Sequence, residues 1–218
     1  MRRKFLAVLT GCLILALTGC GGSDGGPPPI VTQILSDAAF DGDIVQDPQT
    51  GSLTITQGNT QSLFAGIDPV TGAEYRAFLD FPLSGAGGVP GDAIIVSATL
   101  DIVIDSILPQ PLIGTIPIRI DLVSFQPPTL IGDDFDRTLL PALATTTIVP
   151  PVSQADFGNH VPVDVTALMR EAQRLGLPDF QVRIMEDLGI VAPGLIEIND
   201  TTGVNRSALA PLLEVAYF

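Results

Sequence analysis

The stretch from Ala93 to Asp105 alternates apolar and polar residues more regularly than any other part of the chain. Six apolar side chains fall at every second position of this stretch: Ile94, Val96, Ala98, Leu100, Ile102 and Ile104. The intervening positions carry Ser97, Thr99, Asp101 and Asp105 together with Ile95 and Val103. Because successive side chains of a strand point to opposite faces, this pattern predicts a β-strand with one buried face.

Short runs rich in Val, Ile, Leu and Thr recur along the whole chain and are separated by turn-forming residues. The sequence contains 22 Gly and 19 Pro, spread between these runs, which is typical of an all-β protein with many turns. Further strands are predicted over residues 30–35, 52–57, 74–82, 115–125, 179–185, 195–198 and 212–218, and turns over 41–43, 47–51 and 68–72. Pro117 cannot donate a backbone hydrogen bond, so the strand that contains it is expected to lie at a sheet edge or to have a free side at that position.

One segment has helical periodicity instead. Its apolar residues, Val165, Leu168, Met169, Ala172 and Leu175, recur every three or four positions, as on one face of an amphipathic helix. Asp164 is a suitable N-cap, and Gly176 suits the position after the helix, with Pro178 beyond it. A short helix is therefore predicted over about 165–175.

The N-terminal segment has the features of a secretion signal. Met1–Lys4 is cationic, and the apolar run from Phe5 to Leu17 is shorter than the roughly 20 residues that span a bilayer. The following Leu17-Thr18-Gly19-Cys20 resembles a bacterial lipobox. The resemblance implies that residues 1–19 are removed and that Cys20 carries acyl chains such as palmitate. The alternative is an ordinary signal peptide with a chance cysteine.

Residues 20–29 are expected to tether the rest of the chain to a membrane. This Gly/Ser/Pro segment is flexible at first and stiffer in its Pro run, and it reaches on the order of 20 Å. Gly21 replaces the Asp that resembles an inner-membrane retention signal. The expected location is the cell envelope, and the outer membrane in a Gram-negative cell. Residues 30–218 show no internal repeat, so one domain is expected.

The charge of the chain without its signal peptide limits its partners. Seven Arg and no Lys stand against 24 acidic residues after residue 19, which gives a net charge of −17. Such a surface repels nucleic acid. The two cysteines are Cys12, in the signal peptide, and Cys20, so no disulfide and no thiolate zinc site is expected in the mature chain.

Two acidic clusters are candidates for calcium binding, because Ca²⁺ prefers carboxylate and carbonyl oxygens. Asp41 and Asp43 flank Gly42, and Asp133, Asp134 and Asp136 follow Gly132 closely. Neither cluster matches an EF-hand loop. The alternative is that these residues only stabilise turns.

The residues for catalysis are scarce. His160 is the only histidine, and the chain has no Gly-x-Ser-x-Gly motif. Asp101 and Asp105 would lie about 13 Å apart along a strand, too far for a pair of glycosidase carboxylates. The glycine-rich segment 85–91 lacks the Lys-Ser/Thr of a phosphate-binding loop. A protein without enzymatic activity is therefore predicted.

Four segments together resemble the DNRLRE-type domain, which is similar to carbohydrate-binding modules. They occur in the order of that family: 75–81, 94–100, 163–168 and 211–217. The resemblance implies a jelly-roll-like antiparallel β-sandwich with one short helix. The chain departs from the family in having no Trp and in carrying Ala210 where an Arg is usual. Its two tyrosines, Tyr75 and Tyr217, fall at positions expected in the core.

The expected function is a lipid-anchored binding module of the envelope or cell surface, with glycan or cell-wall material as ligand. The alternative is a structural or protein-interaction lipoprotein without affinity for sugars. The sequence identifies no ligand-binding residues for either.

Overall fold

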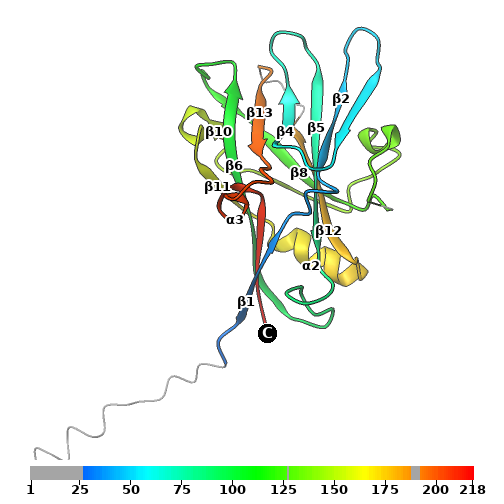
Figure 1. Cartoon of the computed structure of the whole chain (residues 1–218), viewed down its shortest axis with the longest axis vertical. Coiled ribbons are helices and arrows are strands. Elements are labelled where there is room, and N and C mark those ends of the chain that lie inside the picture. The colour runs from blue at the N-terminus through cyan, green and yellow to red at the C-terminus, as the bar shows by residue number, and fades with distance from the viewer. Residues whose placement is uncertain (1–26, 127, 188–191) are drawn as a thin grey trace, which may run out of the picture.

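The computed structural model describes residues 27–126, 128–187 and 192–218 (Figure 1). The signal peptide, Cys20 and the first part of the tether lie outside the described residues, so the predictions made for them stay predictions.

The described chain is an all-β protein in which every strand pair is antiparallel, as predicted. Its strands are β1 (Ile30–Leu35), β2 (Gly42–Gln46), β3 (Leu53–Gln57), β4 (Ser62–Ile67), β5 (Glu74–Pro82), β6 (Ile95–Leu108), β7 (Thr115–Ile116), β8 (Ile118–Val123), β9 (Ala144–Thr147), β10 (Val152–Ser153), β11 (His160–Asp164), β12 (Asp179–Glu186), β13 (Leu195–Asn199) and β14 (Leu212–Tyr217). The helical elements are α2 (Thr166–Leu175), the one-turn α3 (Arg206–Leu209) and the 3₁₀ turns η1 (Gly132–Phe135) and η2 (Gln154–Asp156).

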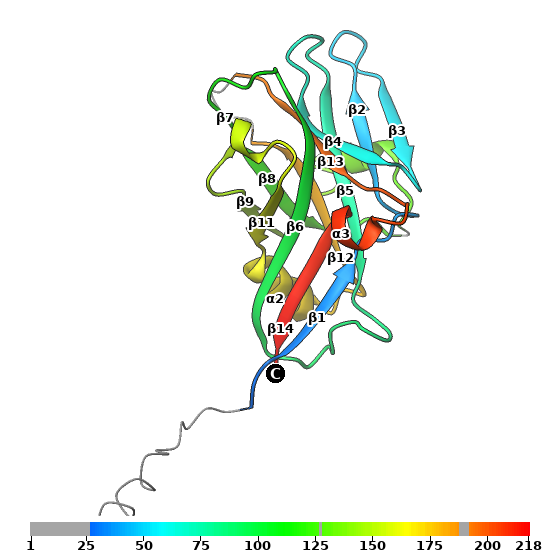
Figure 2. The same cartoon turned by 60° about the vertical axis from the view of Figure 1, so that its left-hand side comes forward.

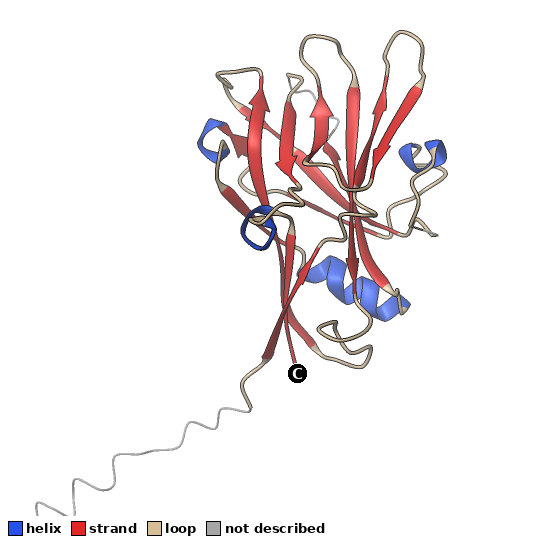
Figure 3. Cartoon of the chain, in the orientation of Figure 1, coloured by secondary structure: helices blue, strands red, loops and turns tan. Residues whose placement is uncertain are grey.

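The long strand β6 joins the two layers of the sandwich. Its first half pairs with β14 and β11, and β1 extends this layer beyond β14. Its second half pairs with β13, from which the other layer continues through β4, β5, β12, β8 and β9. The hairpin of β2 and β3 adds to the free edge of β5. One curled sheet thus forms both layers, and α2 packs near one end of it (Figures 1 and 3).

The main core lies between the layers, and a smaller cluster lies on the outer face of β2, β5 and β8. The smaller cluster consists of Ile44, Phe78, Val123, Phe125, Leu130 and Phe135, with Leu140 packed against it. Residues 124–143 connect β8 to β9 and supply about half of it. Because this connection covers the sheet, both faces of β5 are buried, and Asp121 on β8 is fully buried as well.

A β-bulge in β6 changes which residues of the predicted apolar face are buried. Ala98, Leu100, Ile102 and Ile104 face the core as predicted. Towards the start of the strand, the pairing with β14 shifts from Ser97 opposite Ala216 to Ile95 opposite Tyr217. The extra residue reverses the alternation. Ile95 is therefore buried, and the prediction that Ile94 and Val96 face the core is wrong because both are exposed.

Three other sequence-based predictions need correction. Where a turn was predicted over 41–43, Asp41 directly precedes β2 and Gly42 and Asp43 begin it, and both acidic residues are buried. Pro117 separates β7 from β8 and does not mark an edge, because β8 pairs with β12 on one side and β9 on the other. The additional strands β4 and β9 to β11 and the turn α3 were not predicted.

The two ends of the sandwich differ in what they carry. Strand β1 begins at one end, beside the end of β14 (Figure 2). The β2–β3 and β4–β5 hairpin loops lie at the opposite end (Figure 1). We call these the tether end and the distal end.

Candidate functional site

A polar groove lies between the two hairpin loops of the distal end. It has a volume of about 620 Å³ and is lined by residues of the β2–β3 hairpin and the β4–β5 hairpin: Val45, Asp47, Pro48, Gln49, Ser52, Thr54, Asp68, Val70, Thr71, Ala73 and Tyr75. Carboxylate, amide, hydroxyl and phenol groups therefore face one shared space. We call it the distal groove.

Both walls of the distal groove are held in shape by a carboxylate at the base of each loop. Oδ1 of Asp47 accepts hydrogen bonds from the backbone N–H groups of Gln49, at 2.7 Å, and Thr50, at 2.9 Å. In the other loop, Oδ1 of Asp68 accepts from the N–H of Val70 at 2.7 Å. These donors lower the pKa of both Asp47 and Asp68, so both carboxylates stay ionised. Each loop contains an Asx turn, and the turns predicted over 47–51 and 68–72 are present.

Tyr75 is the aromatic residue that lines the distal groove. The prediction that Tyr75 lies in the core is wrong, because its side chain is only half-buried and lines the groove. Its ring packs against Phe64, with 5.7 Å between the ring centroids. Burial and the nearby carboxylates of Asp68 and Asp43 raise the pKa of the phenol, which keeps it protonated as a hydrogen-bond donor. Tyr217, by contrast, is buried as predicted.

The calcium candidates Asp41 and Asp43 point to different partners. Oδ1 of Asp41 accepts from the N–H of Asp80 at 2.8 Å, and Oδ2 of Asp43 accepts from the N–H of Phe64 at 3.1 Å. Burial and the carboxylate of Asp200 raise the pKa of Asp41 well above its usual range. Arg206 forms an ion pair with Asp200 at 3.4 Å. These contacts hold β2 to β4, β5 and the segment around α3.

The second set of calcium candidates also bonds to its own chain. Oδ2 of Asp134 accepts from the N–H of Ile131 at 2.8 Å, and Oδ1 of Asp136 accepts from the N–H of Thr138 at 2.7 Å. Asp133 is exposed beside them. Within the described residues, no group of three or more Asp, Glu, His or Cys side chains is arranged to hold a metal ion.

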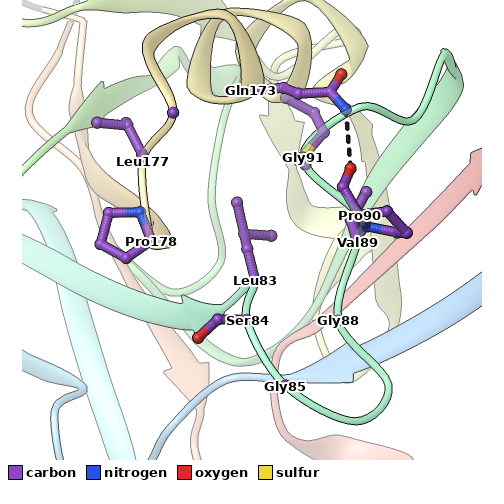
Figure 4. A pocket seen from close by; sticks show the side chains of 12 residues that line it. Leu83, Ser84, Gly85, Gly88, Val89, Pro90, Gly91, Gln173, Leu177 and Pro178 are labelled. Atoms are coloured by element: carbon purple, nitrogen blue, oxygen red, sulfur yellow. Dashed lines mark hydrogen bonds between the residues drawn. The ribbon is translucent and has the colours of Figure 1, made fainter.

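A second cavity, of about 400 Å³, lies between α2 and the β5–β6 connection (Figure 4). Leu83, Val89 and Leu177 supply much of its lining. The amide of Gln173 closes one side by donating to the carbonyl oxygens of Pro90, at 3.1 Å, and Ala93, at 2.5 Å. This cavity therefore offers fewer free polar groups than the distal groove. The glycine-rich segment 85–91 is part of the connection between β5 and β6.

A third cavity, of about 480 Å³, lies beside the edge strand β3. Leu53, Phe135 and Leu139 line it together with Arg76 and Arg137. The guanidinium of Arg76 lies over the ring of Phe135, at 3.9 Å from the centroid, and forms an ion pair with Glu74. Its charge is thus already engaged.

The only histidine lies outside all three cavities. Nδ1 of His160 is 2.8 Å from Oδ2 of Asp101, across β11 and β6. Asp105, the other acidic residue considered on β6, accepts from Nδ2 of Asn199 at 2.6 Å.

The sequence matches no protein-family model, and it matches no curated protein. The resemblance to the DNRLRE-type domain therefore stays a prediction, while the sandwich that it implied is present. No helix in the described part of the chain has the length and apolar character to cross a bilayer.

Proposed function

We propose that this chain is a non-catalytic binding module, anchored to an envelope membrane through acylated Cys20, that binds a glycan in the distal groove. The observation that carries the proposal is the groove itself, in which a half-buried tyrosine lies among amide, hydroxyl and carboxylate groups. Binding sites for small ligands combine apolar contact surface with a few well-placed polar groups. A sugar ring presents hydroxyls at its edge and an apolar face, which suits this combination.

The position of the distal groove supports the same proposal. The tether joins the domain beside the start of β1, and the groove lies at the opposite end (Figure 1). A module held at its tether end would present the groove away from the membrane that anchors it. On that side of the membrane the groove would face cell-wall or surface polysaccharide, and this is the class of ligand that we propose.

The acidic walls limit which glycans fit. Asp47 and Asp68 keep their charge, because local N–H donors lower the pKa of each. Neutral or amine-bearing sugars are therefore favoured over uronic acids, which would be repelled.

The test is a binding titration of residues 20–218 with neutral, amino and acidic oligosaccharides. A neutral or amino sugar is expected to bind, and Tyr75→Ala or Gln49→Ala should weaken it at least tenfold, which corresponds to about 1.4 kcal/mol. Gln126→Ala is the matched control, because it also removes an exposed amide but lies outside the groove. Binding that is unchanged in Tyr75→Ala and Gln49→Ala would exclude the groove.

A protein-interaction role is the second candidate, and the edge strand β3 favours it. Among the strands of the described residues, β3 pairs only with β2, and Leu53 and Ile55 are exposed on it. An uncovered edge with apolar side chains can accept a strand from another protein. Ile55→Lys should then abolish crosslinks to envelope proteins in intact cells, whereas Tyr75→Ala should leave them unchanged.

A further inference from the structure

The tether end carries an exposed apolar surface formed by the ends of three adjacent strands. Its residues are Val31 in β1, Ile94 directly before β6, Val96 in β6 and Phe218 after β14, and we call it the apolar tip. Ile94 is 69% exposed and Phe218 is 53% exposed. These two residues exchange backbone hydrogen bonds of 3.0 and 3.1 Å. Val31 lies opposite Ala216, which lies opposite Ser97 next to Val96.

The bulge in β6 places these side chains on the outer face of the sheet. Without the extra residue, Ile94 and Val96 would alternate in phase with Ala98 and point into the core. The outer face becomes polar at the next outward-facing pair of β1 and β14 after Val31 and Ala216. In that pair, Gln33 donates a hydrogen bond of 2.8 Å to Glu214. The apolar residues are therefore concentrated at the end where the tether joins.

The surroundings of the apolar tip carry little of the acidic charge of the chain. The neighbouring connection, residues 83–91, has no charged side chain, and its Gly87 carbonyl accepts from Oγ1 of Thr32 at 2.7 Å. Asp92 is the acidic residue next to it. Arg170 brings positive charge from α2, because its Nη2 donates to the carbonyl oxygens of Ile95 and Val96, both at 3.0 Å.

We propose that the apolar tip docks into the interfacial region of a lipid bilayer. Only nine residues separate Cys20 from Ile30, and nine extended residues span at most about 30 Å. Acyl chains on Cys20 would hold the tip close to the lipid surface, so docking becomes an intramolecular event for which a weak affinity suffices. Moving exposed apolar side chains from water into the interface lowers the free energy of the system. Docking would fix the orientation of the domain. β6 and β14 would then run away from the membrane plane, and the distal groove would face away from the membrane.

The inference rests on the proposed function, because it assumes that Cys20 is attached to a membrane. The test replaces the acyl chains with a phospholipid that is coupled to Cys20 chemically. Cys20 is the only cysteine after residue 19, so residues 20–218 can be coupled through this thiol to a maleimide phospholipid in phosphatidylcholine vesicles. Acylation in the cell is measured separately by mass spectrometry of the chain recovered from membranes. Its absence would remove the anchor from the proposed function without changing the vesicle result.

The readout uses the absence of Trp from the chain, because one introduced Trp then reports on one position. Phe218→Trp and Ile94→Trp place it in the apolar tip. Val70→Trp is the matched control, since Val70 is 88% exposed in the distal β4–β5 loop. We expect brominated phosphatidylcholine to quench the two tip variants at least twofold more than the control. Equal quenching of all three overturns the proposal.

A further variant separates insertion from mere proximity. Val31→Asp in the Phe218→Trp chain adds a charge within the apolar tip at an exposed position, so the unfolding midpoint should stay unchanged while the excess quenching disappears. Excess quenching that persists overturns the proposal. A second result would also overturn the proposal: brominated lipid does not quench the introduced Trp of the Phe218→Trp variant, but iodide quenches it less as the protein density on the vesicles rises. A second copy of the chain, and not lipid, would then cover the apolar tip.

Discussion

At the scale of single residues, the unusual feature of this acidic chain is how many carboxyl groups lie inside it. Burial raises the pKa of Asp43 to about 6 and that of Asp80 to about 6 as well. The unfolded chain would titrate these groups near 4. Between these values the folded protein binds protons that the unfolded chain releases, so each group makes folding more favourable as the pH falls from 7 to 4.

Asp43→Asn tests this relation. Asn keeps an oxygen that can accept from the N–H of Phe64, and it removes the buried charge. We expect the free energy of unfolding at pH 7 to rise by about 2 to 3 kcal/mol, and this gain to become much smaller near pH 4, where Asp43 is protonated in the folded protein and about half protonated in the unfolded chain. Urea denaturation at pH 7 and pH 4 measures both values. A loss of stability that is equal at the two pH values would contradict the expected protonation.

The buried ion pair of Arg183 and Asp121 gives a second prediction. Both side chains are fully buried, with 2.9 Å between Nη2 and Oδ2. Arg119 also contacts Asp121, at 2.6 Å. Arg183→Met should lower the free energy of unfolding by about 3 kcal/mol, because it leaves a buried carboxylate with only one of its two cationic partners.

The double variant Arg183→Met, Asp121→Leu is the control for this prediction. It removes both buried charges, so part of the lost stability should return. Denaturant titrations of the two variants give the comparison. A double variant that is less stable than Arg183→Met would show that the charges contribute more than their desolvation costs.

At the scale of elements, the sequence predicted what depends on local patterns. The helix α2 and the strands β1, β5 and β12 were predicted within a residue or so of their bounds, because amphipathic periodicity and turn residues mark them. Strand β2 was missed because its Asp-Gly-Asp sequence is typical of a turn. Its carboxylates are tolerated only because β4 and β5 supply N–H donors.

The candidate site was only partly predictable for a related reason. The turns that carry Asp47 and Asp68 follow from their Asp-Pro-x-x-Gly sequences. The groove between them does not, because it depends on two hairpins that meet only after β2 pairs with β5. The exposure of Tyr75 and of Ile94 likewise depends on the position at a sheet end and on a bulge, neither of which alternation reveals.

The pairing of β4 with β13 leaves no room for a side chain at Gly66. Gly66 has a φ of +119°, and a Cβ atom there would lie 2.2 Å from the carbonyl oxygen of Gly194. Gly66→Ala should therefore lower the free energy of unfolding by more than about 2 kcal/mol, through both backbone strain and the clash. Thermal unfolding checks this.

Gly51→Ala is the control for that substitution. Gly51 also has a positive φ, of +69°, but no other atom of the described residues lies within 4 Å of the added Cβ. It should cost only the strain of the left-handed conformation, about 1 kcal/mol. Equal losses in the two variants would mean that the backbone at Gly66 moves away without cost.

At the scale of the whole molecule, the fold is stabilised by its core and by bonds within the chain. The calcium candidates Asp41, Asp43, Asp134 and Asp136 each accept a backbone hydrogen bond. We therefore expect a chelator to leave the thermal unfolding midpoint of residues 20–218 unchanged. Added Ca²⁺ should leave it unchanged as well. A drop of several degrees on chelation would establish a structural calcium ion at one of these clusters.

The antiparallel pairing of β1 with β14 determines how the domain would respond to mechanical load. If a ligand holds the distal end while the membrane holds the tether, the pulling direction runs along β1. All six paired residues from Ile30 to Leu35 would then slide against β14 together, so their hydrogen bonds would share the force instead of breaking one after another. The strand that connects the domain to its anchor is thus loaded in shear, the geometry in which a short β-ladder resists the largest force.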